Sequence, residues 1–296
     1  MTQEVSFPGR VIVGFDGSDA AVRALDRAAD EAVRRGTALE IVCGWPWGKH
    51  PLPDFGVTDE NGQVLYASAR RLIDGASERA RDRAGDLVVI PSLTTESASR
   101  ALLRCGRDAG LTVVGTRGHG GFAGLLLGSV SLRVAAHCTT PLMVVRGETE
   151  VEGGGVLVGV ESEADVPALH FAFQEAARLG GTLRVLHAWQ YPTAPPAVPG
   201  ASYHLSGEEF ERLRKGAEAV PEFTAAPLRE TYPDVRVESE AVCAGAARAL
   251  IEAGRHAEVT VLAAHRRPHR LGLQLGPVTH AVLHHAHGPV VVVPVD

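Results

Sequence analysis

The sequence predicts an α/β protein built from two tandem, doubly wound parallel sheets. Two observations lead to this prediction. Apolar segments of strand length alternate with helical segments, and this alternating pattern occurs twice, as an internal repeat, in the 296 residues. The strand segments, such as VIVGF and PLMVV, lack the polar alternation of a half-exposed strand. Continuous apolar strands are typical of parallel sheets that helices cover on both faces, and right-handed crossovers then wind the chain around the sheet.

The repeat is clearest toward the C-terminal end of each copy. RALLRCGRDAGLTVVGT, which begins at Arg100, resembles RALIEAGRHAEVTVLAA, which begins at Arg248, and this offset of 148 residues continues to the last strand without a gap. The N-terminal parts, RVIVGFDGS and VLVGVESE, match less tightly, which indicates insertions or deletions in loops. We therefore expect two homologous domains, residues 1–149 and 150–296, joined by a short linker near GETEVEGGG.

Strands and helices are expected to alternate within each repeat. Ligands of doubly wound sheets bind beyond the carboxyl ends of the strands, where the winding direction reverses, so the segments that follow strands carry the functional interest. In the first repeat, strands are expected near residues 10–15, 38–44, 86–94, 111–115 and 141–146, and helices near 18–35, 60–83, 97–108 and 129–138.

Composition argues against several classes of protein. A formal charge of −6 is unsuited to a general nucleic-acid or anionic-membrane surface, so no nucleic-acid partner is expected. No apolar run approaches the ~20 residues of a membrane helix, and the first residues lack a secretory pattern. Four cysteines fall singly, without the spacing of a metal site, and suit a reducing compartment. A cytoplasmic protein without membrane insertion is the expectation.

The segment GTRGHGGFAGLLLGSVS places many glycines between a strand and a helix. At Gly115 and Gly118 the missing side chains would let backbone amides approach a ligand closely. Ser129 suits an N-cap, and its hydroxyl could instead bond a phosphate, which the amides and dipole of the helix also favour. The segment is neither a P-loop nor a dinucleotide fingerprint, because it lacks GxxxxGK[ST] and follows the fourth strand rather than the first.

This pattern, G-x2-G-x9-G-[ST], resembles the motif of ATP-binding members of the universal stress protein family. VGFDGS after the first strand, IVCGW at the second and PLMVVR at the last resemble further parts of the family pattern. Because the resemblance covers nearly the whole chain twice, the chain resembles a tandem universal stress protein. The resemblance implies a Rossmann-like fold of the adenine nucleotide α-hydrolase-like type, with strand order 3-2-1-4-5 in each five-stranded parallel sheet.

The resemblance also implies that the first repeat binds ATP, with or without Mg²⁺. Asp16 would lie near the ribose and phosphates, and Arg117 and His119 are candidate charge partners of phosphate. The alternative is a tight strand-to-helix turn without a ligand. The implied binding residues are Gly14, Asp16, Gly44, Gly115, Thr116, Arg117, Gly118, His119, Gly120, Gly121, Gly128, Ser129 and Val130.

The second repeat departs from this motif. Ala263, Arg266 and Pro277 stand where the first repeat has two of its glycines and its serine, and Glu161 replaces Asp16. Either this repeat has lost the nucleotide and acts as a permanent partner of the first, which we favour, or arginines replace the glycine cradle as a cationic site. The arginines concerned are Arg266, Arg267 and Arg270.

Family dimers often pair their last strands edge to edge. The resemblance therefore implies that PLMVVR and PVVVVPV pair within one chain, as an intrachain pseudo-dimer that protects both edges. A homodimer of whole chains stays open. His280 and His284 have a metal-compatible i, i+4 spacing, but no further ligand joins them in a recognised pattern, so solvated helix histidines are expected and no metal site.

The expected function is that of a cytoplasmic ATP-binding regulator of stress response or signalling, gated by its nucleotide and acting on an unknown protein partner. No GxSxG elbow or Ser/His/Asp arrangement is present, so any ATP hydrolysis would be slow. A slow ATPase and a nucleotide-free interaction module are the two alternatives.

Overall fold

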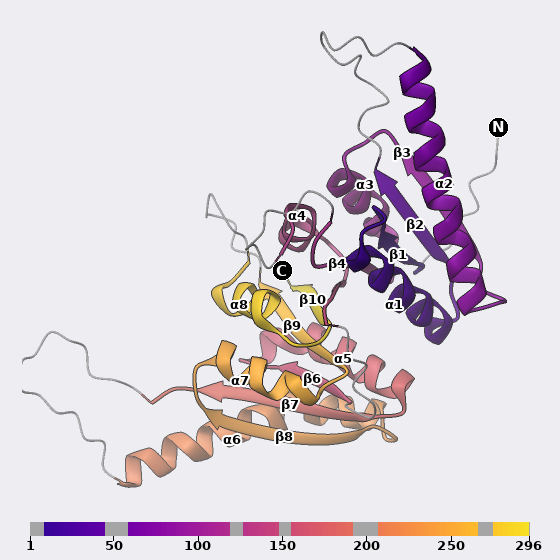
Figure 1. Ribbon diagram of the computed structural model, residues 1–296. Helices are drawn as coiled ribbons and strands as arrows, with labels where there is room; N and C mark the ends of the chain where they lie inside the picture. Colours follow the sequence, from indigo (N-terminus) through magenta and orange to yellow (C-terminus); the bar gives the residue numbers. More distant parts are fainter. Residues whose placement is uncertain are drawn as a thin grey trace, which may run out of the picture.

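The structure, a computed structural model, describes residues 9–44, 59–118, 127–147, 155–191, 207–265 and 275–295. Two repeats of alternating strands and helices follow one another, as the sequence predicts (Figure 1). The first contains β1 (Val11–Gly14), α1 (Asp19–Arg35), β2 (Leu39–Gly44), α2 (Asp59–Arg83), β3 (Val89–Thr94), α3 (Ala98–Cys105), β4 (Leu111–Gly115), α4 (Ser129–His137) and β5 (Leu142–Val145). The second contains β6 (Val156–Gly159), α5 (Val166–Leu179), β7 (Thr182–Trp189), α6 (Gly207–Thr231), β8 (Arg236–Cys243), α7 (Ala246–Ala253), β9 (Val259–His265), α8 (Pro277–His285) and β10 (Val290–Val295).

The strands of the described ranges form one ten-stranded sheet, in the order β3-β2-β1-β4-β5-β10-β9-β6-β7-β8. Each repeat has the implied order 3-2-1-4-5, and its neighbouring strands are parallel. The halves join where β5 and β10 pair antiparallel, with Val144 opposite Val290 and Leu142 opposite Val292. The expected pairing of the last strands within one chain is therefore confirmed. It removes two edges that would otherwise be open to other strands.

Helices cover both faces of this sheet. α1, α2, α5 and α6 pack on one face, and α3, α4, α7 and α8 pack on the other (Figure 1). The buried side chains of each face form one hydrophobic cluster that contains residues of both repeats. Met143 of β5 and Val291 of β10, which face each other across the junction, belong to the same cluster. The hydrophobic cores of the two repeats are thus continuous rather than separated by a polar surface.

The third strand is shorter than predicted. Residues 86–88 were expected to belong to it, but β3 begins at Val89. The chain leaves α2 through a turn in which the Leu87 amide donates to the Ala84 carbonyl at 2.9 Å. This turn contains Gly85 and Asp86, and glycine and aspartate are favoured in turns and disfavoured in strands. As an edge strand, β3 also tolerates Pro91, which has no amide to donate.

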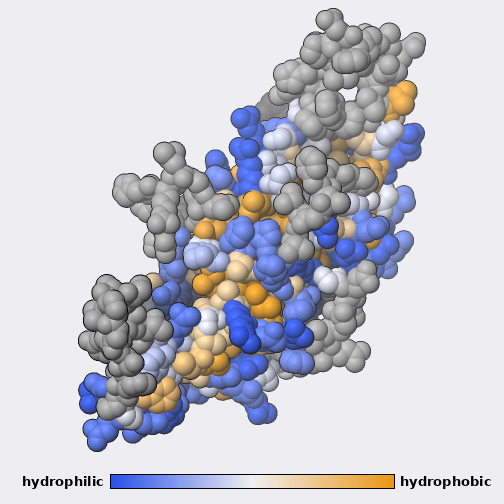
Figure 2. Space-filling view, turned by 60° about the vertical axis from the view of Figure 1, so that its left-hand side comes forward, coloured by the Kyte–Doolittle hydropathy of each residue, from blue (hydrophilic) through white to orange (hydrophobic). Residues whose placement is uncertain are grey.

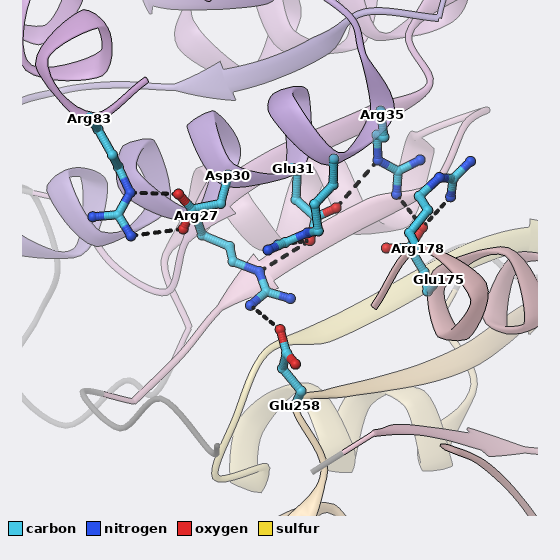
Figure 3. A network of polar contacts seen from close by, with 9 residues as sticks. Arg27, Asp30, Glu31, Arg35, Arg83, Glu175, Arg178 and Glu258 are labelled. Atoms are coloured by element: carbon cyan, nitrogen blue, oxygen red, sulfur yellow. Dashed lines mark hydrogen bonds and ion pairs between the residues drawn. The ribbon is translucent and has the colours of Figure 1, made fainter. Parts of the chain in front are cut away.

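α1 and α5 meet at the junction of the two repeats, where they bury two glutamates (Figure 3). Glu31 and Glu175 are 0% and 1% exposed, and each precedes the left-handed glycine that ends its helix by the same number of residues. Arg35 reaches across from α1 and donates to Glu175 at 2.6 Å, while its Nε lies 3.4 Å from Glu31. Arg178 also donates to Glu175, at 2.5 Å. Side chains of both repeats therefore share one buried ionic network.

The pKa values of these two equivalent glutamates move in opposite directions. Burial raises the pKa of Glu175, the charge of Glu31 raises it further, and its two arginine partners do not offset these effects. Burial alone would also raise the pKa of Glu31, but Arg27, Arg34 and Arg35 together lower it. The interface therefore favours an ionised carboxylate at position 31 and disfavours one at position 175.

The exposed large hydrophobic side chains of the described ranges come from several different elements. On the face drawn in Figure 2, hydrophilic side chains occupy much of the outline, and hydrophobic ones lie mainly toward the middle of the view. No helix among the described residues combines the length and apolar character needed to cross a bilayer. The exposed hydrophobic residues are Val33, Val64, Tyr66, Val88, Val130, Val166, Leu213 and Phe223.

Candidate functional site

A cavity of about 200 Å³ lies in the first repeat at the C-terminal ends of β1 and β4. These neighbouring strands are followed by connections that run in opposite directions along the sheet, so the cavity occupies the switch point where doubly wound sheets bind ligands. Its walls come from the ends of the two strands and from the first turns of α1, α3 and α4. The lining residues are Gly14, Phe15, Asp16, Ala21, Ala98, Leu102, Val114, Gly115, Arg117, Gly118, Gly128, Ser129, Val130 and Ser131.

Asp16 is held at one side of this cavity by the turn that begins α1. Its Oδ1 accepts hydrogen bonds from the Ser18 amide at 3.0 Å and from the Ser18 hydroxyl at 2.7 Å. The same hydroxyl lies 3.3 Å from the Arg117 carbonyl, which links the end of β1 to the end of β4. A Cβ on Gly118 would lie only 2.1 Å from Asp16 Oδ2. A glycine at position 118 therefore lets the carboxylate lie against the loop.

The opposite side is the N-terminus of α4. The Gly128 amide donates to the Thr116 carbonyl at 2.6 Å and so closes the loop at its base, and the Gly128 carbonyl accepts the first helical bond, from Leu132, at 2.9 Å. Ser129 was expected to be the N-cap, but this expectation is wrong: Gly128 is the N-cap and Ser129 is the first helical residue. The amides of residues 129–131 consequently have no acceptor within the helix and lie at the cavity wall.

Three of the predicted glycines have a packing role. A Cβ on Gly115 would lie 2.6 Å from the Ala20 carbonyl of α1, and a Cβ on Gly44 would lie 2.6 Å from the Ala98 amide of α3. A Cβ on Gly14 would lie 2.9 Å from a methyl group of Leu102, also in α3. These glycines allow helices to approach the strand ends closely, which brings the helix N-termini to the cavity. The sequence interpretation of Gly115 as an opening for a ligand missed this contact.

The structure brings together most of the residues that the motif implies, and it adds Ser18 and Ser131. The Asp-Gly-Ser turn was a usable signal for Ser18, because aspartate commonly accepts a bond from the amide two residues later. No sequence signal pointed to Ser131, whose hydroxyl donates to the Gly115 carbonyl at 2.7 Å. Gly44 and Thr116 are not among the described residues that line the cavity. His119, Gly120 and Gly121 lie outside the described residues.

The second repeat has a cavity at the corresponding position, of about 440 Å³. Glu161 was expected to take the place of Asp16 and does line the cavity, but it is exposed, whereas the buried carboxylate is Asp165. His265, at the end of β9, donates to Asp165. Sequence reasoning missed this pair because its members are 100 residues apart. Arg266, Arg267 and Arg270, the proposed cationic replacements, lie outside the described residues.

Arg146 connects the rim of the first cavity with the second repeat. Arg146 directly follows β5. Its guanidinium donates to the carbonyls of His284 and Ala286 at the end of α8, and the contact with Ala286 is 3.3 Å long. Burial and the nearby charge of Arg117 lower the pKa of Arg146. The cationic side of the first cavity is therefore electrostatically coupled to a residue that caps a helix of the other repeat.

Comparisons with known proteins agree with this architecture. The universal stress protein of Mycobacterium tuberculosis H37Rv called Rv2005c is 31% identical over 296 residues, 95% of this chain and 96% of its own. One from Mycolicibacterium smegmatis is 30% identical over 298 residues, 96% of each chain. A solved universal stress protein from Archaeoglobus fulgidus DSM 4304 covers 97% of this chain and 98% of its own with a TM-score of 0.67, and at 15% identity it shows the shared fold.

A shorter solved chain, a universal stress protein in complex with cAMP, is 29% identical over 48% of this chain and 99% of its own, with a TM-score of 0.35. The sequence profile of the universal stress protein family matches residues 8–146 and again residues 155–294. The two matches cover both halves of the ten-stranded sheet. The chain thus belongs to the universal stress protein family, with two copies of the family's fold in tandem.

Proposed function

We propose that the first repeat binds ATP and that the bound nucleotide biases the conformation or partner choice of a cytoplasmic regulatory protein. The observation that carries this proposal is the N-terminus of α4. Three amides without helical acceptors and the Ser129 hydroxyl lie on the wall of a cavity at the switch point of the sheet. Such a helix start favours a phosphate group through its amides and its dipole.

The charges around the cavity fit a nucleotide. Arg117 lines it and forms no ion pair within the described residues, so its guanidinium is available to a phosphate. A phosphate there would also reduce the repulsion between Arg117 and Arg146. Asp16, on the other side, suits a ribose hydroxyl or a Mg²⁺ ion, since carboxylate oxygens are ligands that this ion prefers. Bound Mg²⁺ would neutralise phosphate charge.

The two repeats would then have different tasks. In the proposed division, residues 1–149 form the nucleotide-binding domain and residues 150–296 form a second domain that stays attached as an intrachain partner. Pro277, which begins α8, has no amide to donate and no hydroxyl, so a phosphate would find fewer donors in the second cavity.

Exchange of residues between the repeats tests the ATP proposal. Ser129→Pro gives the first repeat the residue of the second, and because proline is well tolerated at the first helical position, α4 should still form. The variant loses an amide donor and a hydroxyl, so calorimetric titration of the full chain should show ATP affinity reduced at least about tenfold, the equivalent of about 1.4 kcal/mol. The matched control, Pro277→Ser, should leave it unchanged. Equal ATP affinity in Ser129→Pro and wild type would refute the assignment.

A further inference from the structure

A further cavity, of about 780 Å³, lies in the first repeat at the edge of the sheet where β2 and β3 begin. Its walls come from the last turns of α1 and α2 and from the connections that lead into these two strands. The two switch-point cavities lie at the opposite edge, where strands end, and this cavity shares no lining residue with either of them. Its volume falls within the ~300–1,000 Å³ typical of ligand pockets.

Two large apolar side chains are exposed on the walls of this cavity. Val33 of α1 is 55% exposed, and Val88, which directly precedes β3, is 52% exposed. Leu87 and Ala84 add to the apolar surface. Single exposed hydrophobic residues need no explanation, but two on the walls of one concave surface are typical of an interaction site.

The second repeat has different side chains at the equivalent positions. The turn after α6 contains the same hydrogen bond as the turn after α2, accepted by the carbonyl of Tyr232 in one and of Ala84 in the other. Tyr232 therefore takes the place of Ala84, at the offset of 148 residues that relates the repeats. At the same offset, Arg236 takes the place of Val88, and its side chain is 78% exposed. An exposed apolar residue of the first repeat is thus a charged residue in the second.

Aromatic rings pack between the helix and the turn in the second repeat. The Tyr232 ring stacks on Phe173 of α5 with a centroid distance of 5.5 Å, and its hydroxyl lies 3.1 Å from Nε2 of His170. The equivalent of Phe173 in α1 is Ala29, which stands at the same distance from the glycine that ends its helix. The first repeat therefore has two alanines, Ala29 and Ala84, where the second has two stacked rings. Its cavity lies beside a position that the second repeat fills with an aromatic side chain.

The charges of the cavity favour a cation over an anion. Arg83 donates to both carboxylate oxygens of Asp30, at 2.6 and 2.8 Å (Figure 3). Burial alone would lower the pKa of Arg34, but Glu31, which accepts a hydrogen bond from it at 2.8 Å, raises it together with nearby carboxylates. Both arginines are thus compensated, and the remaining polar residue of the wall besides Asp86 is an uncharged threonine. Asp86 is exposed and has no ion pair within the described residues. The C-terminal ends of α1 and α2 add partial negative charge.

We propose that this cavity is the docking site for a protein segment that presents an aromatic side chain next to basic residues. The ring contacts Val33 and Val88, and a basic residue lies beside Asp86 and the ends of the two helices. The partner thereby supplies from outside the kind of ring that the second repeat carries in its own chain as Tyr232. The site is separate from the nucleotide cavity, and the proposal does not rest on ATP binding.

The test is an NMR titration of the isotopically labelled full chain, without nucleotide, with the peptide acetyl-Ala-Lys-Tyr-Lys-Ala-amide. We expect saturable shifts of the methyl signals of Val33 and Val88 at millimolar peptide. A peptide with alanine in place of tyrosine should not bind. A peptide with glutamates in place of both lysines should bind at least about threefold more weakly, since each exposed ion pair contributes little.

Residues exchanged between the repeats provide the variants. Ala84→Tyr supplies the ring within the chain and should abolish peptide binding without lowering the thermal unfolding midpoint. Val88→Arg removes an apolar wall and repels the lysines, so peptide affinity should fall about tenfold or more. The matched control is Val64→Arg, because Val64 of α2 is 61% exposed and does not line the cavity. This control should leave the affinity unchanged, and circular dichroism should show all three variants folded.

Three results would overturn the proposal: no saturable shifts at millimolar peptide, equal peptide affinity of folded Val88→Arg and wild type, or equal affinity for the lysine and glutamate peptides. Sedimentation of the free chain gives a further check. A dimer that Val88→Arg dissociates would show that a second copy of the chain covers the cavity, and would also overturn the proposal. ATP titration of Val88→Arg should match that of wild type, so the failure of either proposal is visible independently of the other.

Discussion

The cavities of the two repeats lie at the same switch point of their half-sheets but differ in chemistry. In the first, Arg117 and the amides that begin α4 face a carboxylate that is anchored at the rim. In the second, the helix begins with Pro277, and a buried aspartate holds a histidine at the wall. Both helices nevertheless follow a glycine N-cap with extended backbone, Gly128 and Gly276. The comparison shows that the backbone frame of a site can persist while its charge pattern is exchanged.

Two equivalent glutamates at the junction of the repeats also differ in their electrostatic surroundings. Glu31 and Glu175 occupy equivalent helix positions and are both buried, but three arginines surround the first, whereas the second also has Glu31 as a neighbour. Their pKa values therefore move in opposite directions. Equivalent residues in a tandem repeat become distinguishable once the repeats pack against each other.

The largest effect is expected for Glu31→Gln. Removing this charge leaves Arg34 partly buried without its carboxylate, while Arg27 retains only Glu258, and breaking one partner of a buried ion pair typically costs about 3–5 kcal/mol. Urea unfolding at neutral pH should show a loss near about 3 kcal/mol, since glutamine retains hydrogen bonds. Asp30→Asn removes a half-exposed ion pair with Arg83 and should cost less than about 1 kcal/mol. Similar losses for both variants would contradict the importance of burial.

A smaller loss is expected for Gly115→Ala, which places in the first repeat the residue that the second has at position 263. The new Cβ would lie 2.6 Å from the Ala20 carbonyl, and relief requires α1 to move away from β4. Overpacking of this kind costs about 1–3 kcal/mol, measurable as a lower unfolding midpoint. The reciprocal change, Ala263→Gly, should cost about 1 kcal/mol or less. If both changes are neutral, the close packing does not distinguish the repeats.

The smallest effect, and the most diagnostic, is the pH dependence of Glu175→Gln. Because folding raises the pKa of Glu175, its stabilising contribution is present below its unfolded pKa and is lost as the pH rises through its folded pKa. Relative to wild type, Glu175→Gln should therefore gain stability with rising pH. Folding lowers the pKa of Glu31, and the stabilising contribution of Glu31 is therefore lost as the pH falls. Relative to wild type, Glu31→Gln should lose stability with rising pH. Denaturant titrations from acidic to neutral pH measure both slopes, and slopes of the same sign would reject the opposed pKa directions.

Much of the fold follows from local patterns in the sequence. Continuous apolar strands predicted the parallel sheet, and the spacing of glycines and serine in GTRGHGGFAGLLLGSVS marked the cavity-lining strand and helix ends. Comparison of the two copies also identified Pro277 as one of the residues that distinguish the second repeat from the first. These signals are readable because strand burial, helix starts and tight turns depend mainly on residues close together in the chain.

Tertiary structure alone decided the remaining features. Asp165 meets His265, and Arg35 meets Glu175, at sequence separations of 100 and 140 residues, and no local pattern indicates such partners. Gly115 is needed because α1 packs against the end of β4, and the Ser129 position within α4 depends on the bond from Gly128 to Thr116. The sequence by itself determined the two repeated half-sheets and the place of each cavity. Packing decided the partners of the cavity residues and the directions in which the pKa values of Glu31 and Glu175 move, because burial and neighbouring charges act through space.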